Sequence, residues 1–495
     1  MPINTDKKVM QYINGEFIPS QSGKSFRNIS PFTNNMINEV AEGGSAEINA
    51  AVAAAKEAFD NGPWGKMKVA ERLDYIRKIA DIIDAHADEI AYLEAVDTGL
   101  PISQTKKQAA RASQNFRFYA ETVSTRMAGE AYQVDNEFLN YTIHKPIGVA
   151  GLITPWNAPF MLETWKIAPA LATGNTVVLK PAELSPLSAG RLAEIIHEAE
   201  LPNGVFNVVH GFGETAGAAL VAHPDAKLIS FTGETVTGSE IMKNGADQLK
   251  RYSMELGGKS PIIVFDDADF DRALDAAVWG IFSFNGERCT ANSRLLVQET
   301  IKDKFVAALK ERIGNIIIGD PLDQQTEVGP LISAEHYEKV KSYIKIAAEE
   351  GADVISADIP ADLSKGNYVA PTLLLNVTNG MRVAQEEIFG PVMAVISFKD
   401  ETEAIALAND VTYGLAGYVW TKDLQRGHRV AQAVDSGMLW INSQNVRDLR
   451  IPFGGSKHSG IGREGGHYAF EFYTETQVIH VALGDHHIPQ FGKKE

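Results

Sequence analysis

Short, wholly apolar runs that alternate with helical segments restrict the fold of this chain more than any other feature. In the middle of the chain these runs are residues 148–153, 176–179, 204–209 and 228–231. Segments with helical patterning, residues 188–200 and 215–223, lie between the later runs. Short apolar runs are typical of parallel strands buried on both faces. Strands that alternate with helices indicate βαβ units, so we expect a doubly wound α/β sheet.

A second α/β series begins at residues 260–265. Its first helix is expected to start near Asp269, because apolar residues follow at helical spacing. Its further strands are predicted at residues 294–298, 394–398, 416–420 and 437–441. Helical spacing also runs from about residue 46 to 102. A chain of 495 residues is too long for one ordinary core, so two or three tightly packed domains are expected.

Composition and charge exclude several classes of protein. A hydrophobic content of 44% and a charged content of 22% are typical of soluble globular proteins. The net charge of -17 argues against nucleic acid and anionic membranes as partners. The N-terminus lacks the pattern of a signal peptide, and a chain with one cysteine suits a reducing compartment. We therefore expect a cytoplasmic location.

The single cysteine, Cys289, cannot form a disulfide within the chain. It is therefore either an inert buried thiol or a nucleophile. Asn285 and Glu287 are poor neighbours for a core thiol, and the adjacent Arg288 favours the reactive thiolate. The helix that precedes Cys289 would disfavour a thiolate at its C-terminal end, so its dipole is not the activator.

Small and polar residues follow several of the predicted strands. The turns at residues 211–217 and 231–238 contain Gly213 and Gly233 and open helices, an arrangement that lets backbone N–H groups approach a pyrophosphate. Lys180 and Glu183 follow another strand, where ligands of open sheets bind, and are placed to hold a ribose. Neither turn has the usual Gly-x-Gly-x-x-Gly pattern, so plain solvated turns are equally compatible with these segments.

Three further segments carry side chains suited to chemistry. Asn157 stands between two prolines, Glu255 precedes a pair of glycines, and Glu387 precedes Phe389 and a Gly-Pro turn. Each segment alone is equally compatible with a structural turn. Together an amide donor, a carboxylate, a thiol and a dinucleotide fold suggest one reaction. A thiol adds to a carbonyl, a hydride leaves to nicotinamide, and the thioester is hydrolysed.

These motifs resemble those of the aldehyde dehydrogenase superfamily, over residues 15–484. The residues that match in order are Asn157, Lys180, Gly233, Glu255, Cys289, Glu387 and Phe453. Further matches are residues 414–416, 440–442 and 452–457. The resemblance implies that Cys289 is the nucleophile and that Asn157, with the backbone N–H of Cys289, forms the oxyanion hole. It implies that Glu255 activates the hydrolytic water.

The resemblance implies a Rossmann-like cofactor domain, a second α/β catalytic domain and a small β oligomerisation element. The expected boundaries are residues 1–127 and 147–257 for the first, 258–458 for the second, and 128–146 with 473–495 for the third. The runs at 138–144 and 477–482 resemble the strands of that element. A homodimer or homotetramer is therefore expected. His486 and His487 lack clustered ligands, so no metal site is expected.

NAD is the cofactor that the resemblance implies. Lys180 and Glu183 would hold the adenosine ribose, Glu387 the nicotinamide ribose, and Phe389 would pack nearby. The remaining expected cofactor contacts are Trp156, Gly213, Gly233, Glu234 and Leu256. Glu183 favours NAD because it would repel a 2′-phosphate, although Lys180 beside it leaves NADP as the alternative. Glu234 stands where most relatives have Ser, and a carboxylate near a pyrophosphate is unfavourable unless it points away.

The expected substrate contacts are Trp165, Arg447, Arg450 and Phe453. Arg447 stands where members that oxidise apolar aldehydes carry an aromatic residue, and an arginine suits a carboxylate. The alternative is an Arg447 paired with Asp448 or with another acid at the rim of the substrate tunnel. The motifs at residues 231–235, 285–290, 446–450 and 485–489 resemble the 5-carboxymethyl-2-hydroxymuconate semialdehyde dehydrogenases of aromatic catabolism.

The substrate implied by this closer resemblance is a carboxylated semialdehyde. The alternatives are a broad-specificity aliphatic or aromatic aldehyde dehydrogenase, a CoA-acylating relative, or a non-catalytic protein that retains the fold. Glu255 argues against the CoA-acylating relative, which does not need that base.

Overall fold

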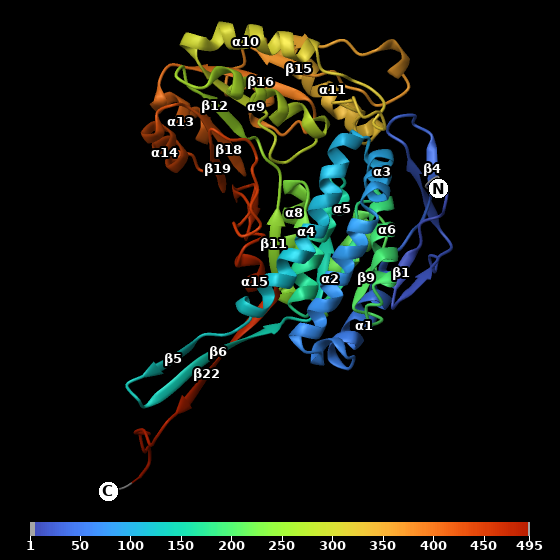
Figure 1. Ribbon diagram of the computed structural model, residues 1–495, viewed down its shortest axis with the longest axis vertical. Coiled ribbons are helices and arrows are strands. Elements are labelled where there is room, and N and C mark those ends of the chain that lie inside the picture. The colour runs from blue at the N-terminus through green and yellow to red at the C-terminus, as the bar shows by residue number, and fades with distance from the viewer. Residues whose placement is uncertain (1–4, 494–495) are drawn as a thin grey trace.

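The computed structural model describes residues 5–493. It contains two large sheets, each covered by helices, and a small sheet that projects from them (Figure 1). The predicted α/β fold class is confirmed. Residues 1–4 and 494–495, at the outer ends of the first and third predicted units, lie outside the described residues. Within the described range, no helix is long and apolar enough to cross a membrane.

The first sheet has eight strands in the order β2-β1-β9-β8-β7-β10-β11-β21. Its parallel strands are β7 (Val149–Ile153), β8 (Thr176–Lys180), β9 (Phe206–Val208), β10 (Ala226–Thr232) and β11 (Arg251–Glu255). Its antiparallel strands are β1 (Gln11–Ile13), β2 (Glu16–Ile18) and β21 (Gly460–Ile461). The four predicted strands are present. Residues 459–472, which the expected boundaries leave unassigned, return the chain to this sheet through β21.

Helices cover both faces of the first sheet because its parallel strands are apolar on both faces. One core joins the sheet to α2 (Val69–Ala85), α4 (Ile102–Arg126), α5 (Pro159–Ala172) and α6 (Pro186–Glu198). The opposite core joins it to α1 (Ser45–Asp60), α7 (Ala218–Ala222) and α8 (Thr235–Gly245). The helix predicted at residues 215–223 is instead a π-helical turn at Gly213–Gly217 followed by α7. In the π-helical turn the N–H of Gly217 donates to the carbonyl of Phe212.

The second sheet has seven strands in the order β14-β15-β16-β13-β12-β18-β19. They are β12 (Pro261–Val264), β13 (Arg294–Gln298), β14 (Asp353–Ser356), β15 (Thr372–Leu375), β16 (Val392–Phe398), β18 (Ala416–Trp420) and β19 (Met438–Ile441). All but β14 are parallel, and the predicted strands are present. The helix predicted near Asp269 is α9 (Phe270–Phe282), whose first turn is capped by the Asp269 carboxylate.

The other helices of the second unit are α10 (Glu299–Gly314), α11 (Ala334–Glu349), α12 (Arg382–Gln385), α13 (Glu401–Asn409) and α14 (Leu424–Ala433). The remaining elements are α3 (Ala87–Thr98), α15 (Tyr468–Tyr473), β3 (Ser25–Ile29), β4 (Met36–Ala41), β17 (Tyr413–Gly414) and β20 (Ser456–Lys457). The small projecting sheet is antiparallel and consists of β5 (Ala131–Val134), β6 (Phe138–Pro146) and β22 (Thr474–Ala482) (Figure 1).

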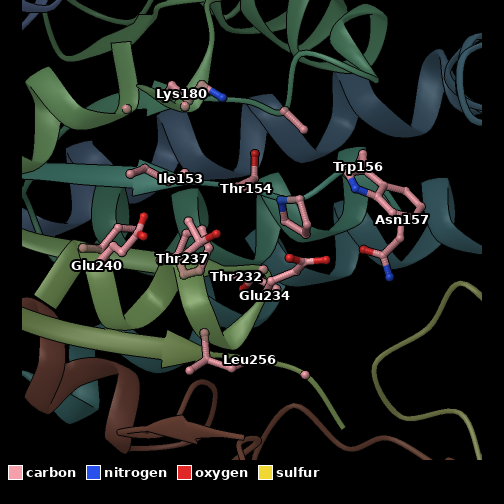
Figure 2. Close-up of a pocket in the computed structure, with 18 of the residues that line it drawn as sticks. Ile153, Thr154, Trp156, Asn157, Lys180, Thr232, Glu234, Thr237, Glu240 and Leu256 are labelled. Atoms are coloured by element: carbon pink, nitrogen blue, oxygen red, sulfur yellow. The ribbon is translucent and has the colours of Figure 1, made fainter. Parts of the chain in front are cut away.

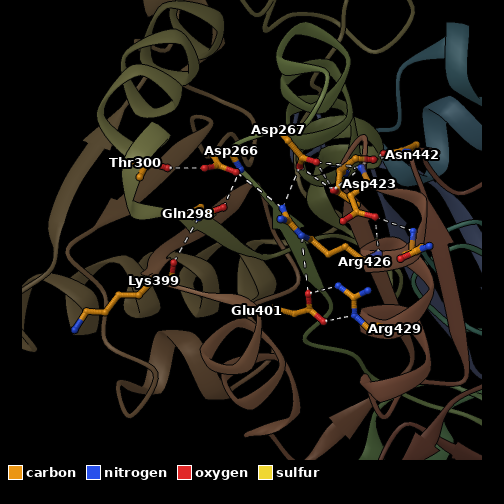
Figure 3. Close-up of polar contacts among 12 residues, drawn as sticks. Asp266, Asp267, Gln298, Thr300, Lys399, Glu401, Asp423, Arg426, Arg429 and Asn442 are labelled. Atoms are coloured by element: carbon orange, nitrogen blue, oxygen red, sulfur yellow. Dashed lines mark hydrogen bonds and ion pairs between the residues drawn. The ribbon is translucent and has the colours of Figure 1, made fainter.

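The two large sheets reverse their strand order at the first parallel strand but use opposite ends. In the first sheet β7 lies between β8 and β10, and in the second sheet β12 lies between β13 and β18, the arrangement that creates a ligand crevice at the carboxyl ends of the strands. In the second sheet that end is filled by ion pairs (Figure 3). Asp267 accepts from the Thr421 hydroxyl at 2.7 Å and lies 3.3 Å from Arg426 Nη1, and Arg429 binds Glu401 at 2.9 Å. The crevice is therefore occupied by the protein's own charges.

Candidate active site

A cavity of about 380 Å³ lies at the carboxyl ends of the first sheet, where the second unit faces it. It brings together most of the predicted catalytic and cofactor residues, several of which Figure 2 shows around one space. These residues are Trp156, Asn157, Lys180, Glu183, Gly213, Gly233, Glu234, Leu256, Cys289, Glu387 and Phe389. The segments that carry Cys289 and Glu387 precede strands β13 and β16, so the second sheet presents its amino ends to the cavity.

The loop before Cys289 is held by buried polar side chains. Asn285 is fully buried, donates to the carbonyl of Pro330 at 2.9 Å and accepts from the N–H of Gly329 at 2.7 Å. Buried Glu287 accepts from the N–H of Ile332 at 3.0 Å. The expectation that Asn285 and Glu287 are unsuited to a core is therefore wrong, because a distant segment satisfies their hydrogen bonds.

The Cys289 thiol is partly buried, and burial raises its pKa to about 11. Arg447 opposes this rise most, and the adjacent Arg288 opposes it less. The reason is that Arg288 points elsewhere: its guanidinium lies 4.6 Å from the centre of the Trp279 ring and donates to the carbonyl of Gly280. The prediction that Arg288 is the cation that favours the thiolate is corrected in favour of Arg447.

Asn157 lies between the buried strand β7 and helix α5, which begins at Pro159. Its side chain is 8% exposed, and Nδ2 donates to the carbonyl of Glu287 at 2.8 Å. That bond fixes the amide against the loop that carries Cys289. An amide nitrogen has two N–H groups, so this contact leaves one for a ligand in the cavity that Asn157 and Cys289 both line.

Glu255 ends strand β11 and is 3% exposed. Neither carboxylate oxygen has a hydrogen-bond partner among the described residues. Burial raises its pKa well above the usual range, and nearby Glu464 raises it further. Lys166 and Arg447 act in the opposite direction. Glu255 is thus a desolvated carboxyl group whose negative charge contributes to raising the pKa of Cys289.

Lys166 and Glu464 are charged residues near Glu255 that the sequence analysis missed. The Lys166 ammonium binds Glu464, and both also contact the Ser230 hydroxyl. Lys166 has no exposed side-chain surface. The sequence signal was a lysine between the apolar residues Trp165 and Ile167 of α5, because a lysine is almost never fully buried unless it is paired.

One part of the cavity carries polar groups of the kind that bind a ribose and phosphates. Lys180 Nζ lies 2.9 Å from Glu183 Oε2 at the end of β8. The hydroxyls of Thr154 and Thr232 line the cavity and have no partner among the described residues, so they are available to a ligand. Beside Gly213 the space that a Cβ would occupy is open.

The other end of the cavity is formed by the segment that contains Glu387 and Phe389. Glu387 accepts from the N–H of Gly258 at 2.8 Å, and burial raises its pKa to about 7. The Phe389 ring meets Trp156 edge to face at 5.3 Å. The backbone carbonyl of Phe389 lies 2.7 Å from Nε2 of His336, a residue of α11, which holds this segment in place.

The predicted substrate residues are only partly brought together. Trp165 and Phe453 meet edge to face at 6.1 Å, and the Arg447 guanidinium lies 3.8 Å from the Phe453 ring centre. Arg450, by contrast, is 79% exposed and binds Asp448 at 2.6 Å. Asp448 therefore pairs with Arg450, and the alternative in which Asp448 pairs with Arg447 is wrong.

Arg111 is a second arginine near Arg447 that the sequence analysis missed. Arg111 lies on α4. The pKa of Arg447 is lowered to about 10, mainly because Arg447 is buried and next because the positive charge of Arg111 is near. Arg447 Nε has no hydrogen-bond partner among the described residues. Arg447 therefore places positive charge near Cys289, with Arg111 and the carboxyl group of Glu255 among its charged neighbours. In the described part of the chain, no group of His, Cys, Asp or Glu side chains is arranged to hold a metal ion.

The chain belongs to the aldehyde dehydrogenase family, whose profile matches residues 17–479. It is 52% identical to the 5-carboxymethyl-2-hydroxymuconate semialdehyde dehydrogenase of Escherichia coli, over 94% of this chain and 98% of that protein. The crystal structure of HpcC from Thermus thermophilus matches with a TM-score of 0.96 at 53% identity, over 98% and 95% of the two chains.

PnpE, solved in complex with nicotinamide adenine dinucleotide, is a further relative. It matches with a TM-score of 0.95 at 41% identity, over 98% of this chain and 99% of that chain. The predicted family, the enzyme class and the fold class are confirmed by these comparisons.

Proposed function

We propose that this protein oxidises a carboxylated semialdehyde of aromatic catabolism, such as 5-carboxymethyl-2-hydroxymuconate semialdehyde, to the carboxylic acid with NAD. The observation that carries the substrate class is Arg447, which lies near Cys289 and near Arg111 without a hydrogen-bond partner for its Nε among the described residues. Two desolvated guanidinium groups favour an anionic substrate because arginine binds carboxylates through two parallel hydrogen bonds.

Cys289 is the nucleophile of the proposed mechanism. Its thiolate adds to the aldehyde carbon, and the free N–H of Asn157 together with the backbone N–H of Cys289 stabilises the developing oxyanion. Loss of a hydride converts the thiohemiacetal into a thioester. Glu255 takes a proton from water, which then hydrolyses the thioester and regenerates the thiol. The raised pKa of Glu255 suits a base that must hold and release a proton.

NAD, when bound, supplies the acceptor for the hydride. We propose that Lys180 and Glu183 hold its adenosine ribose and Glu387 its nicotinamide ribose. Trp156, Leu256 and Phe389 contribute apolar surface, and Gly213 and Gly233 allow close approach of the backbone. The relative solved in complex with nicotinamide adenine dinucleotide supports the choice of cofactor. Glu183 favours NAD over NADP because a carboxylate repels a 2′-phosphate.

The expected division into units and assembly is supported by the sheets. We propose an NAD-binding unit of residues 1–127 and 147–257, a catalytic unit of residues 258–458 and an oligomerisation unit of residues 128–146 and 473–495. Residues 459–472 belong to the NAD-binding unit, because β21 pairs with β11 there. The projecting sheet exposes apolar side chains, including Tyr132 at 57% and Val478 at 55%, which favours association of copies of this chain. We place the homodimer or homotetramer in the cytoplasm.

Arg447→Gln tests the substrate class. We expect it to raise the KM for a carboxylated semialdehyde about tenfold or more, because a charged hydrogen bond contributes about 1.5–3 kcal/mol. The KM for a neutral aldehyde of the same length should change little. Arg111→Gln should act in the same direction. Steady-state kinetics with both aldehydes and with NAD or NADP provide the measurement.

Arg450→Gln is the matched control, because Arg450 lies in the same segment but is exposed and paired with Asp448. It should leave both KM values near those of the parent. Equal effects of Arg447→Gln on charged and neutral aldehydes would contradict the anion site and favour a broad-specificity enzyme.

A further inference from the structure

Glu234 is the residue of the phosphate-binding turn that departs from the family pattern. It precedes helix α8 as the N-cap residue, and its side chain makes no capping hydrogen bond. It instead lines the cavity that the proposed cofactor residues share (Figure 2). The amino end of a helix favours anions because of its free N–H groups and its dipole. A carboxylate fixed there opposes the binding of an anionic ligand.

Lys339 meets Glu234 from the other α/β unit. It lies on α11, which packs in the core of the second unit, and it lines the same cavity. Its Nζ lies 2.9 Å from Glu234 Oε1. The ion pair therefore joins the start of α8 in the first unit to α11 in the second. The Glu234 carboxylate therefore does not point away from the cavity, and its charge is balanced by Lys339 on the opposite wall.

The pair is exposed enough to open easily. The side chain of Glu234 is 68% exposed and that of Lys339 is 38% exposed. Ion pairs with this exposure contribute little to folding, because water solvates both charges when the pair is broken. Because both side chains line the cavity, the ion pair instead affects how strongly a charged ligand binds there.

We propose that Glu234 and Lys339 form a clasp that a dinucleotide opens when it binds, and that Glu234 thereby weakens cofactor binding and speeds cofactor release. This inference rests on the proposed use of NAD. In the closed clasp Glu234 neutralises Lys339 and adds negative charge beside a site for phosphates. In the open clasp Lys339 is free to meet the negative charge of the ligand. Glu234 is thus a determinant of affinity and takes no part in the chemistry.

Isothermal titration calorimetry with NAD, on the cofactor-free enzyme, tests the clasp. Glu234→Gln is expected to lower the Kd about threefold to tenfold, equivalent to about 1 kcal/mol. Lys339→Met is expected to raise the Kd more in the Glu234→Gln background than in the parent, because in the parent the ammonium must first leave its ion pair with Glu234 to meet the ligand. Stopped-flow displacement should show slower NADH release from Glu234→Gln than from the parent.

Glu338→Gln is the matched control. Glu338 lies beside Lys339 on α11, is 69% exposed and faces Lys341 on the same helix at 3.7 Å. The clasp is overturned if Glu234→Gln binds NAD no more tightly than Glu338→Gln, or if the effects of the Glu234 and Lys339 changes simply add. A parent enzyme that binds no NAD overturns the proposed cofactor and the clasp with it, whereas normal binding with unchanged variants overturns the clasp alone.

Discussion

Cys289 shows how far the reactivity of a residue depends on contacts distant in sequence. The thiol is desolvated, and this alone raises its pKa. The cation that opposes the rise most is Arg447, far along the chain, whereas the neighbouring Arg288 is engaged with Trp279 and Gly280. Adjacent side chains diverge from the backbone, so adjacency in sequence does not make Arg288 the partner of the thiol.

The alkylation rate of Cys289 by iodoacetamide should rise with pH throughout the range from about 7 to 10. Only the thiolate reacts, and because the pKa of the Cys289 thiol is about 11, the fraction of thiolate is small at pH 7 and still rises at pH 10. Arg447→Gln should slow the reaction at each pH, because it removes the main charge that lowers the pKa. Mass spectrometry follows a single site, since the chain has one cysteine. A rate that levels off near pH 8 in the cofactor-free parent would contradict the raised pKa.

The loop before Cys289 is the element that connects distant parts of the molecule. Phe284 and Asn285 have positive φ values of 55° and 56°, and Asn285 bonds to the segment at Gly329 and Pro330. The backbone N–H of Phe284 donates to the Gln104 side chain at 2.7 Å, which ties the loop to α4 of the first unit. The thiol is therefore positioned by contacts from both units.

Asn285→Ala should destabilise this loop by about 3 kcal/mol, because it removes buried hydrogen bonds and leaves their partners unsatisfied. A lower Tm and a lower kcat are expected together, since Cys289 follows directly. Asn376→Ala is the control: Asn376 has the same φ of 56° but is exposed, with one side-chain bond to Asp353. Differential scanning calorimetry and steady-state kinetics give both readouts. Equal losses in the two variants would show that backbone strain, rather than the buried bonds, sets the effect.

Across the whole molecule, the two α/β units face each other with opposite ends of their sheets. The first unit presents its carboxyl ends and an open cavity, and the second presents its amino ends while ion pairs around Arg426 fill its own crevice (Figure 3). The projecting sheet stands apart from both units (Figure 1). An antiparallel sheet with exposed apolar side chains is stabilised when another surface covers it.

Val478→Asp should weaken self-association, because Val478 is 55% exposed on β22 and a charge there is costly to bury in an interface. Size-exclusion chromatography with light scattering should show a smaller species than the parent. Ile317→Asp is the control, since Ile317 is 48% exposed and lies after α10, away from the projecting sheet. A parent that is already monomeric, or an unchanged mass for Val478→Asp, would contradict the proposed assembly.

The sequence alone predicted the fold class and the central parallel strands of both large sheets, and its short motifs singled out Asn157, Glu255 and Cys289, because apolar periodicity and short motifs are local properties. It missed the edge strands β1, β2, β14 and β21 and the strands β11 and β15. Only the tertiary structure decided that Arg447 and Arg111 lie near each other, that Asn285 and Glu287 are buried, and that Glu234 meets Lys339. These contacts join residues far apart in sequence. Electrostatic interactions depend on the distance between charges in space and on their burial, and the local pattern of residues determines neither.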